Sequence, residues 1–171
     1  MSNYIGRAVN IAVQKNQPVS LVHFITSRCN ARCSFCFIDF DNKDTFKGEL
    51  TLEEISKLSK NLGTKISNIN ITGGEPFARK DMKEIAEIYL NNDNIISLFI
   101  TSNGSLPDRI ENFINYISPR FPNKNITFSL SIDHFEEQHD KIRKVKGLFN
   151  KCIESYNILK TFKKNIFCNV A

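Results

Sequence analysis

The chain lacks the segments that mark non-globular, membrane-spanning or exported proteins. Its 171 residues include only 7 glycines and 5 prolines and show no internal repeat, which excludes a linker or a low-complexity segment. No apolar run approaches the roughly 18 residues that a membrane span needs, and the N-terminus has no signal-peptide pattern. We therefore expect a cytoplasmic globular protein with one hydrophobic core.

Positive charge is in modest excess but is not concentrated in one tract. The formal net charge is +5, and the 23 lysines and arginines are spread over amphipathic segments. This distribution gives no indication of a nucleic-acid partner. The densest cluster is interpreted as solvated surface, with a contact to phosphate or another anion as the alternative. Its members are Lys141, Arg143, Lys144 and Lys146.

The five cysteines form one cluster and two isolated positions. An odd number of cysteines without an export signal argues against a disulfide framework. Cys29, Cys33 and Cys36 fall within eight positions, whereas Cys152 and Cys168 stand apart. We expect the isolated pair to be core residues, because Cys152 lies on an apolar helical stripe.

Hydrophobic periodicity predicts strands that alternate with helices. Thr51 and Glu54 have the spacing of a capping box at the start of the first helix, and Gly63 follows its end. Asp81 is the expected N-cap of the second helix, and Pro107 opens the third at Asp108. The predicted strands are residues 19–25, 66–71, 95–101, 126–132 and 166–170. The first two helices are predicted over 51–62 and 81–90, and a last helix over 148–162.

This order of elements predicts an α/β fold with a parallel sheet and right-handed crossovers. The strands alternate apolar and polar residues, as in residues 126–132, where Ile126 and Phe128 flank Thr127. Helices would cover the apolar face, so the polar face would line something wet or liganded, such as the lumen of an open barrel. Exposure at a sheet edge is the alternative. Polar side chains gather toward the carboxyl ends of the strands, where parallel α/β folds bind ligands.

The three clustered cysteines directly follow the first predicted strand, at that ligand end. Three thiolates on one short loop suit either an iron–sulfur cluster or zinc. A structural zinc site needs a fourth protein ligand, which His23, Cys152 or Cys168 would have to supply from outside the loop. His23 is expected to pack in the core. The pattern therefore favours a [4Fe–4S] cluster with one iron open to a non-protein ligand.

These residues together resemble the radical S-adenosylmethionine (radical SAM) superfamily. The cysteine spacing, with aromatic Phe35 before the last cysteine, is the first match, and three further matches each end a predicted strand. A later basic segment is also similar. The further matches are Gly73-Gly74-Glu75-Pro76, Thr101-Ser102-Asn103-Gly104, Ser129-Leu130-Ser131-Ile132-Asp133 and, in the later segment, His139-Asp140-x-x-Arg143 with Gly147-x-Phe149.

The resemblance implies a partial TIM-like (β/α) barrel over residues 19–171, after a lead-in of residues 1–18, with the chain ending inside its fifth strand. It also implies a [4Fe–4S] cluster on Cys29, Cys33 and Cys36, and S-adenosylmethionine chelated to the open iron. Reductive cleavage of that cofactor would give a 5′-deoxyadenosyl radical, which abstracts hydrogen from a substrate. The residues implied to bind the cofactor are Phe35, Gly73, Gly74, Glu75, Ser102, Asn103, Ser131 and Asp133.

Within that set, Glu75 would meet the ammonium group of the cofactor, and Ser131 and Asp133 its ribose or carboxylate. Phe35 would pack near the adenine or staple the cluster loop. Arg143 is either a ligand of the methionine carboxylate or a surface residue. The substrate, whether peptide, lipid or small molecule, is not defined by these motifs, and an electron donor such as flavodoxin or ferredoxin is implied. The alternatives are a truncated, non-catalytic cluster-binding fragment and a zinc-stabilised binding module.

Overall fold

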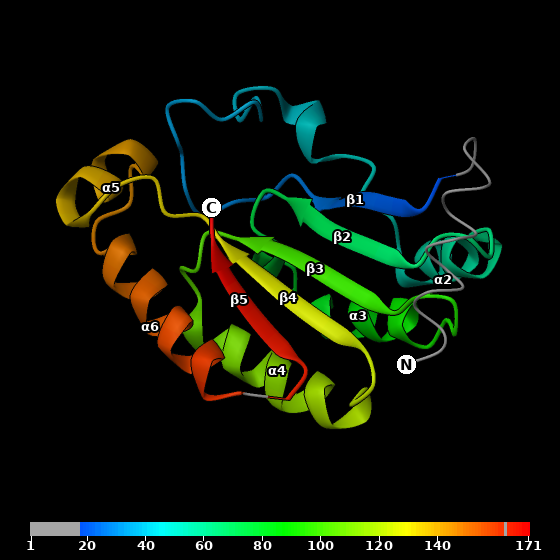
Figure 1. The fold of residues 1–171 in the computed structure, drawn as a ribbon. Coiled ribbons are helices and arrows are strands. Elements are labelled where there is room, and N and C mark those ends of the chain that lie inside the picture. Colours follow the sequence, from blue (N-terminus) through cyan, green and yellow to red (C-terminus); the bar gives the residue numbers. More distant parts are fainter. Residues whose placement is uncertain (1–17, 163) are drawn as a thin grey trace.

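The computed structural model describes residues 18–162 and 164–171, which form a single α/β unit (Figure 1). Of the expected lead-in, all but Pro18 lies outside the described residues. The strands are β1 (Ser20–Thr26), β2 (Asn68–Gly73), β3 (Ser97–Ser102), β4 (Asn125–Leu130) and β5 (Ile166–Val170). The helices are α2 (Leu52–Asn61), α3 (Met82–Leu90), α4 (Pro107–Arg120), α5 (Glu136–Arg143) and α6 (Leu148–Thr161), with short 3-10 helices η1 (Lys43–Phe46) and η2 (Pro76–Ala78).

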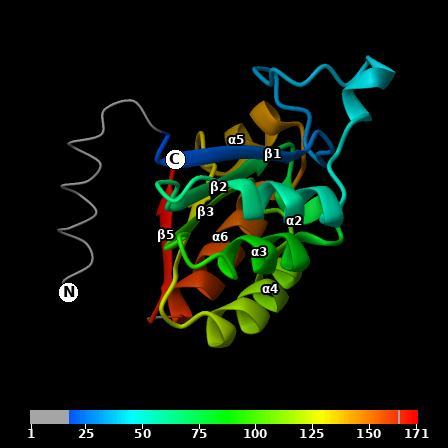
Figure 2. The same ribbon diagram turned by 90° about the vertical axis from the view of Figure 1, so that its right-hand side faces the viewer.

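The five strands form one parallel sheet in the order β1-β2-β3-β4-β5. Helices α2, α3, α4 and α6 lie along one face of this sheet (Figures 1 and 2). Each crossover returns the chain to a strand beside the one just completed. The predicted α/β class and the partial-barrel arrangement of alternating strands and helices are confirmed. No helix in the described ranges has the length and hydropathy of a membrane span.

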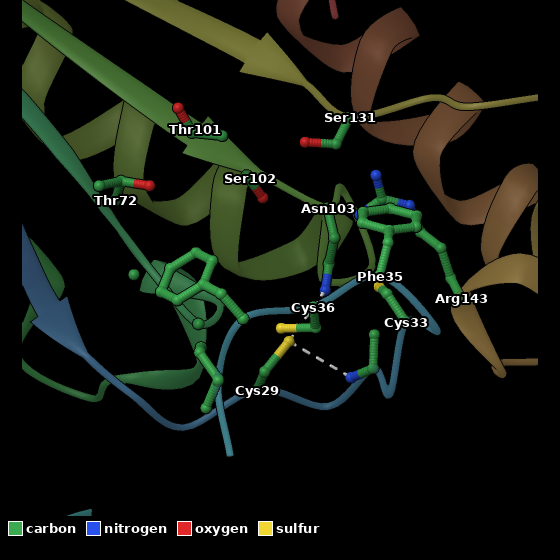
Figure 3. Close-up of a pocket in the computed structure, with 15 residues that line it drawn as sticks. Cys29, Cys33, Phe35, Cys36, Thr72, Thr101, Ser102, Asn103, Ser131 and Arg143 are labelled. Atoms are coloured by element: carbon green, nitrogen blue, oxygen red, sulfur yellow. Dashed lines mark hydrogen bonds between the residues drawn. The ribbon is translucent and has the colours of Figure 1, made fainter. Parts of the chain in front are cut away.

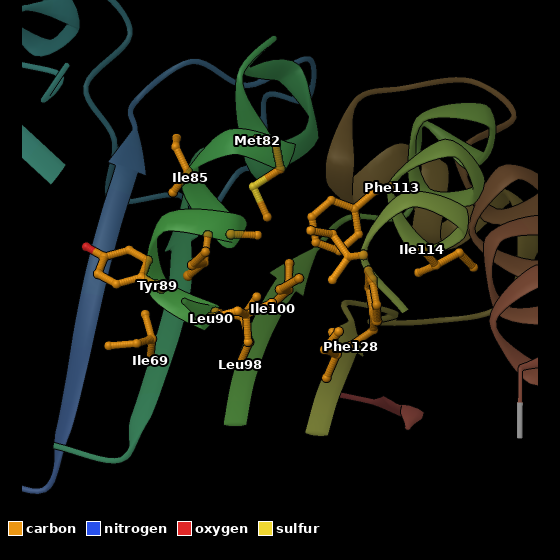
Figure 4. Packing of buried hydrophobic residues seen from close by; sticks show 14 of the residues in the cluster. Ile69, Met82, Ile85, Tyr89, Leu90, Leu98, Ile100, Phe113, Ile114 and Phe128 are labelled. Atoms are coloured by element: carbon orange, nitrogen blue, oxygen red, sulfur yellow. The ribbon is translucent and has the colours of Figure 1, made fainter. Parts of the chain in front are cut away.

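Helices α3 and α4 each bury an apolar stripe against the sheet. Phe77, Phe113 and Phe128 pack against one another with ring centroids 5.4–6.1 Å apart, which joins η2, α4 and β4. Figure 4 shows Phe113 and Phe128 within this core. Burial of these rings is a major part of the stability of the helical face. The α3 and α4 residues are Met82, Ile85, Ala86, Tyr89, Ile110, Phe113, Ile114 and Ile117.

Local hydrogen bonds explain where the element boundaries differ from those predicted. Strands β2 and β3 each begin two residues later than expected, because Ile66 and Ile95 donate their backbone N–H groups to preceding turns, at Gly63 and Asn92. The capping box of Thr51 and Glu54 is present. Asp81 precedes α3 as expected, but its carboxylate makes no cap hydrogen bond and pairs instead with Arg79 at 2.7 Å.

The two faces of the sheet differ in chemistry. Apart from His23 and Ser102, side chains toward the helices in the described strands are apolar or cysteine, such as Ile69, Leu98 and Ile126 in one row across the sheet. The alternate residues point away from the helices, and we call this side the open face. Among the described strands, no open-face residue is charged. These residues are Ser20, Val22 and Phe24 of β1, Asn68, Asn70 and Thr72 of β2, Ser97, Phe99 and Thr101 of β3, Asn125, Thr127 and Ser129 of β4, and Phe167 and Asn169 of β5.

Candidate functional site

A cavity of about 230 Å³ lies at the carboxyl ends of β2 and β3, bordered by the loop after β1 and by Arg143 (Figure 3). Thr72 and Thr101 bring the open face to its edge, so the cavity and the open face are continuous. The three clustered cysteines line this cavity, together with six of the residues predicted to bind the cofactor. Those six are Phe35, Gly73, Gly74, Ser102, Asn103 and Ser131.

The cysteine loop turns tightly. Cys36 donates its backbone N–H to the Cys33 carbonyl at 3.2 Å, and Cys29 Sγ accepts the backbone N–H of Ala31 at 3.4 Å. In Figure 3 the sulfur atoms of Cys29 and Cys36 point toward one another, and Cys33 lies beside Phe35 and Arg143. All three cysteines are half-buried, so their thiols face the cavity while the loop keeps contact with solvent.

Helix α5 braces this loop. Arg32 and Ser34 donate their backbone N–H groups to the carbonyls of Arg143 and Ile142, at 3.1 and 3.2 Å. These carbonyls belong to the last turn of α5, where helical partners are missing, so each side satisfies the other. Helix α5 is not predicted from the sequence. Its signal was present in acidic residues at the start and basic residues at the end, which suit the helix dipole.

The surroundings of Cys29 and Cys33 favour the protonated thiol over the thiolate. Burial raises the pKa of Cys29, and the N–H of Ala31 opposes this rise. Burial also raises the pKa of Cys33, and the charge of Arg143 opposes it. Iron would displace these protons, because thiolate is the form that binds.

The same thiols are not grouped around a single point. Within residues 18–162 and 164–171, no three His, Cys, Asp or Glu side chains are placed to hold one metal ion. In a [4Fe–4S] cluster each cysteine binds a different iron, so its three sulfurs need not converge as they must around zinc. Three cysteines on one loop are therefore a donor set that fits a [4Fe–4S] cluster.

Gly73 and Gly74 are required by the close approach of two backbones. A Cβ on Gly73 would lie 2.2 Å from the carbonyl oxygen of Thr26, and one on Gly74 would lie 2.2 Å from that of Arg28. Gly73 also has a φ of +131°, which favours glycine. Gly74 donates its N–H to Thr26 at 2.7 Å. The turn after β2 is thus fastened to the chain that leads into the cysteine loop.

Glu75 is fully buried and is not among the residues that line the cavity. Its Oε1 accepts hydrogen bonds from the N–H of Phe77 at 3.0 Å and the hydroxyl of Ser102 at 2.9 Å. Its Oε2 accepts the N–H of Asn103 at 2.7 Å. Burial raises the pKa of Glu75, and these three donors oppose the rise. Glu75 therefore connects the end of β3 to the turn after β2.

Asp133 is turned toward Arg143 and does not line the cavity either. The Arg143 guanidinium binds both its oxygens, at 2.6 and 2.9 Å. Arg143 itself is only 8% exposed and borders the cavity, with its Cζ 5.8 Å from the centre of the Phe35 ring. The interpretation of the basic cluster as solvated surface therefore fails for Arg143, whereas Lys141, Lys144 and Lys146 are exposed.

The residues expected in the core are placed there or packed against it. Cys152 is fully buried beside Gly104, and burial raises the pKa of its thiol to about 12. Cys168 packs against the core from β5, and burial raises its pKa to about 11. His23 Nδ1 lies 2.8 Å from the hydroxyl of Tyr89.

Five cavity-lining residues were not predicted from the sequence to bind the cluster or the cofactor: Ala31, Phe37, Ile38, Thr72 and Thr101. Thr72 and Thr101 continue the polar alternation of β2 and β3, which is the signal that would have found them. Phe37 and Ile38 follow the last clustered cysteine, and nothing in a short apolar pair distinguishes a cavity wall from core.

Comparisons with known proteins agree with this geometry. The sequence model of the Radical SAM superfamily matches residues 24–170. A GTP 3',8-cyclase of Alkaliphilus oremlandii (strain OhILAs) is 35% identical over 133 residues, which are 75% of this chain and 41% of the relative. A GTP 3',8-cyclase of Haemophilus influenzae (strain PittGG) is 44% identical over 87 residues, 47% of this chain and 24% of the relative.

Solved structures of low sequence identity share the fold. One is described as native anSMEcpe with bound AdoMet and Kp18Cys peptide; its TM-score is 0.69 at 20% identity, over 90% of this chain and 43% of that one. Another is Streptococcus suis SuiB bound to precursor peptide SuiA, with a TM-score of 0.63 at 18% identity, over 99% of this chain and 36% of that one. The chain thus spans less than half the length of each of these relatives.

Proposed function

Because this chain belongs to the radical SAM superfamily, whose enzymes use a [4Fe–4S] cluster and S-adenosylmethionine, we propose that Cys29, Cys33 and Cys36 hold the cluster and that the adjoining cavity holds the cofactor. When bound there, the cluster and cofactor would supply one-electron reductive cleavage of the cofactor and, from it, abstraction of a hydrogen atom from the substrate. The observation that carries this proposal is the meeting of three thiols and one arginine around a single cavity at the carboxyl ends of the strands.

Arg143 is the residue that we assign to the methionine carboxylate. Among the described residues that border the cavity it is the one cation, and its planar guanidinium suits a carboxylate. Asp133 then acts by orienting Arg143, rather than by binding ribose directly. Ser131 remains available to the cofactor, because it lines the cavity.

Phe35 is the side chain that we assign to the adenine. It is 62% exposed beside Arg143, so its ring is free to stack on a planar ligand. Gly73 and Gly74 present bare backbone to the cavity. The role of Glu75 in this proposal is to hold Ser102 and Asn103, since its carboxylate is already used by three donors.

The substrate part that lies on the open face is proposed to be uncharged. That face offers hydroxyls, amides and the aromatic rings of Phe24, Phe99 and Phe167, and no charged side chain among the described strands. A triphosphate such as GTP, named in the curated relatives, would be expected to need several cations there. The electron is proposed to come from a protein such as flavodoxin or ferredoxin.

Anaerobic reconstitution with iron and sulfide tests the central proposal. We expect about four irons per chain, visible iron–sulfur absorbance, and 5′-deoxyadenosine after reduction by dithionite with S-adenosylmethionine. Cys33→Ala should lose the cluster, whereas Cys168→Ser, the matched control outside the loop, should keep it. Stoichiometric zinc without iron would contradict the proposal. Cluster assembly without cofactor cleavage would favour the non-catalytic alternative.

Isothermal titration calorimetry with GTP tests the substrate class. We expect no saturable binding of GTP to the reconstituted chain under conditions where S-adenosylmethionine binds. Saturable GTP binding that Asn70→Asp abolishes would overturn the assignment of an uncharged substrate, because the added carboxylate repels phosphate from the open face.

A further inference from the structure

The side-chain amide of Asn103 reaches one of the three thiols. Its Nδ2 lies 3.7 Å from Cys29 Sγ and 3.0 Å from Asn30 Oδ1. The same sulfur accepts the backbone N–H of Ala31 at 3.4 Å. Cys29 therefore receives two N–H groups, one from its own loop and one from the segment after β3 (Figure 3).

The orientation of this amide is fixed at both ends. Asn103 Oδ1 accepts the backbone N–H of Ser105 at 2.9 Å, so the nitrogen must face the cysteine loop. Asn30 in turn donates its own amide to the Ser105 hydroxyl at 2.7 Å. The amide group thus sits in a closed set of hydrogen bonds.

Glu75 fixes the backbone that carries this amide. Its Oε2 accepts the N–H of Asn103, and its Oε1 accepts the hydroxyl of the preceding Ser102. Because Glu75 is fully buried, any displacement of Asn103 would leave a carboxylate oxygen without its donor. Glu75 is therefore a positioning residue for Asn103.

We infer that the N–H of Asn103 tunes the reduction potential of the cluster held by Cys29, and that Glu75 positions it. This inference rests on the proposed function. One-electron reduction adds negative charge to the cluster and its sulfurs, so an N–H aimed at a ligand sulfur stabilises the reduced form more than the oxidised form. The Asn103 amide thereby raises the potential and eases the uptake of the electron.

A purely structural role for Asn103 makes a different prediction. If its amide only ties the cysteine loop to the segment after β3, then its loss should lower stability and leave the potential unchanged. Ser105→Ala offers the matched control, because it removes the link between Asn30 and Ser105 while leaving the contact between Asn103 and Cys29.

The test is a redox titration of the reconstituted 171-residue chain, followed by electron paramagnetic resonance of the reduced cluster. Asn103→Asp keeps the acceptor for Ser105 and loses both N–H groups, and Asn103→Ala loses them without adding charge. At the wild-type midpoint, we expect the ratio of reduced to oxidised cluster to fall about tenfold in Asn103→Asp, a shift of roughly 59 mV for one electron. The ratio should fall less in Asn103→Ala and stay at the wild-type value in Ser105→Ala.

A wild-type potential in both Asn103 variants would overturn the inference, and so would an equal fall in Ser105→Ala. Failure of both Asn103 variants to assemble a cluster would also overturn it, because Asn103 would then serve assembly rather than tuning. Failure of the wild-type chain to assemble any cluster would instead remove the proposed function. The two proposals can therefore fail separately.

Discussion

Arg143 donates two hydrogen bonds to the carboxylate of Asp133, from Nε to Oδ2 at 2.6 Å and from Nη2 to Oδ1 at 2.9 Å. The arginine is almost buried, whereas the Asp133 side chain is 26% exposed. The pair holds the guanidinium at the edge of the cavity, while the carbonyl of the same arginine braces the cysteine loop. One residue thus links the cofactor cavity to the loop that carries the thiols.

Asp133→Asn should weaken both the structural role of Arg143 and its proposed binding of the cofactor. The substitution leaves a nearly buried guanidinium without its acid, so we expect the free energy of unfolding to fall by about 2 kcal/mol. Urea unfolding of the apo chain measures this loss, and calorimetry on the reconstituted chain should show weaker S-adenosylmethionine binding. Asp41→Asn, at an exposed aspartate, is the control and should change neither. Unchanged stability and binding in Asp133→Asn would disprove the assigned role.

Gly73→Ala and Gly74→Ala should each be strongly destabilising. The added methyl group would meet a backbone carbonyl at 2.2 Å in either variant, and backbone moves aside less easily than a flexible side chain. We expect losses of about 2–4 kcal/mol by urea unfolding, in the range of overpacked or strained sites. Gly63→Ala is the matched control, because a Cβ there has open space, and it should be neutral or slightly stabilising. Equal effects at the three glycines would refute this interpretation.

The stability of the apo chain should fall as the pH drops below about 6.5. Burial lowers the pKa of His23 from 6.5, and the charge of Arg79 lowers it further. The unfolded chain therefore binds a proton that the folded chain resists, so acid favours unfolding through this residue. Urea unfolding at pH 7.5 and 5.5 should show a smaller decrease in His23→Gln than in wild type. His134→Gln, at an exposed histidine, should keep the wild-type decrease; an identical decrease in His23→Gln would contradict the prediction.

Lys144→Gly should stabilise the chain. Lys144 ends α5 in the left-handed conformation, with φ 55° and ψ 38°, which glycine adopts without cost. We expect a gain of about 0.5–1 kcal/mol in the free energy of unfolding. Lys141→Gly, inside the same helix, should lose a similar amount. A loss in both variants would show that the left-handed position is not strained.

Most of the framework follows from local patterns. The stripes of α3 and α4 and the capping box of Thr51 could be read from residue spacing, because a helix on one face of a sheet needs a continuous apolar side. Helix α5 could not, since only His139 and Arg143 are buried in it. Among its remaining side chains only Ile142 is apolar, so there is no apolar stripe to detect.

It was harder to predict where the side chains at the site point than to predict which residues belong to the site. The motifs placed Glu75 and Asp133 at the right end of the sheet, yet both carboxylates are used within the protein. Asn103, a partner of Glu75, lies far from it in the sequence. Arg143, the partner of Asp133, lies in a helix that was not predicted. Spacing along one chain carries no information about such pairings.

The brace from α5 also sets an order of events during synthesis. The ribosome delivers Arg32 and Ser34 early, but their acceptors, the carbonyls of Ile142 and Arg143, emerge only after four strands have been made. Until then the N–H groups of the nascent cysteine loop face water. The loop can reach its final shape, and offer its three thiols in the arrangement described, only once α5 has left the ribosome.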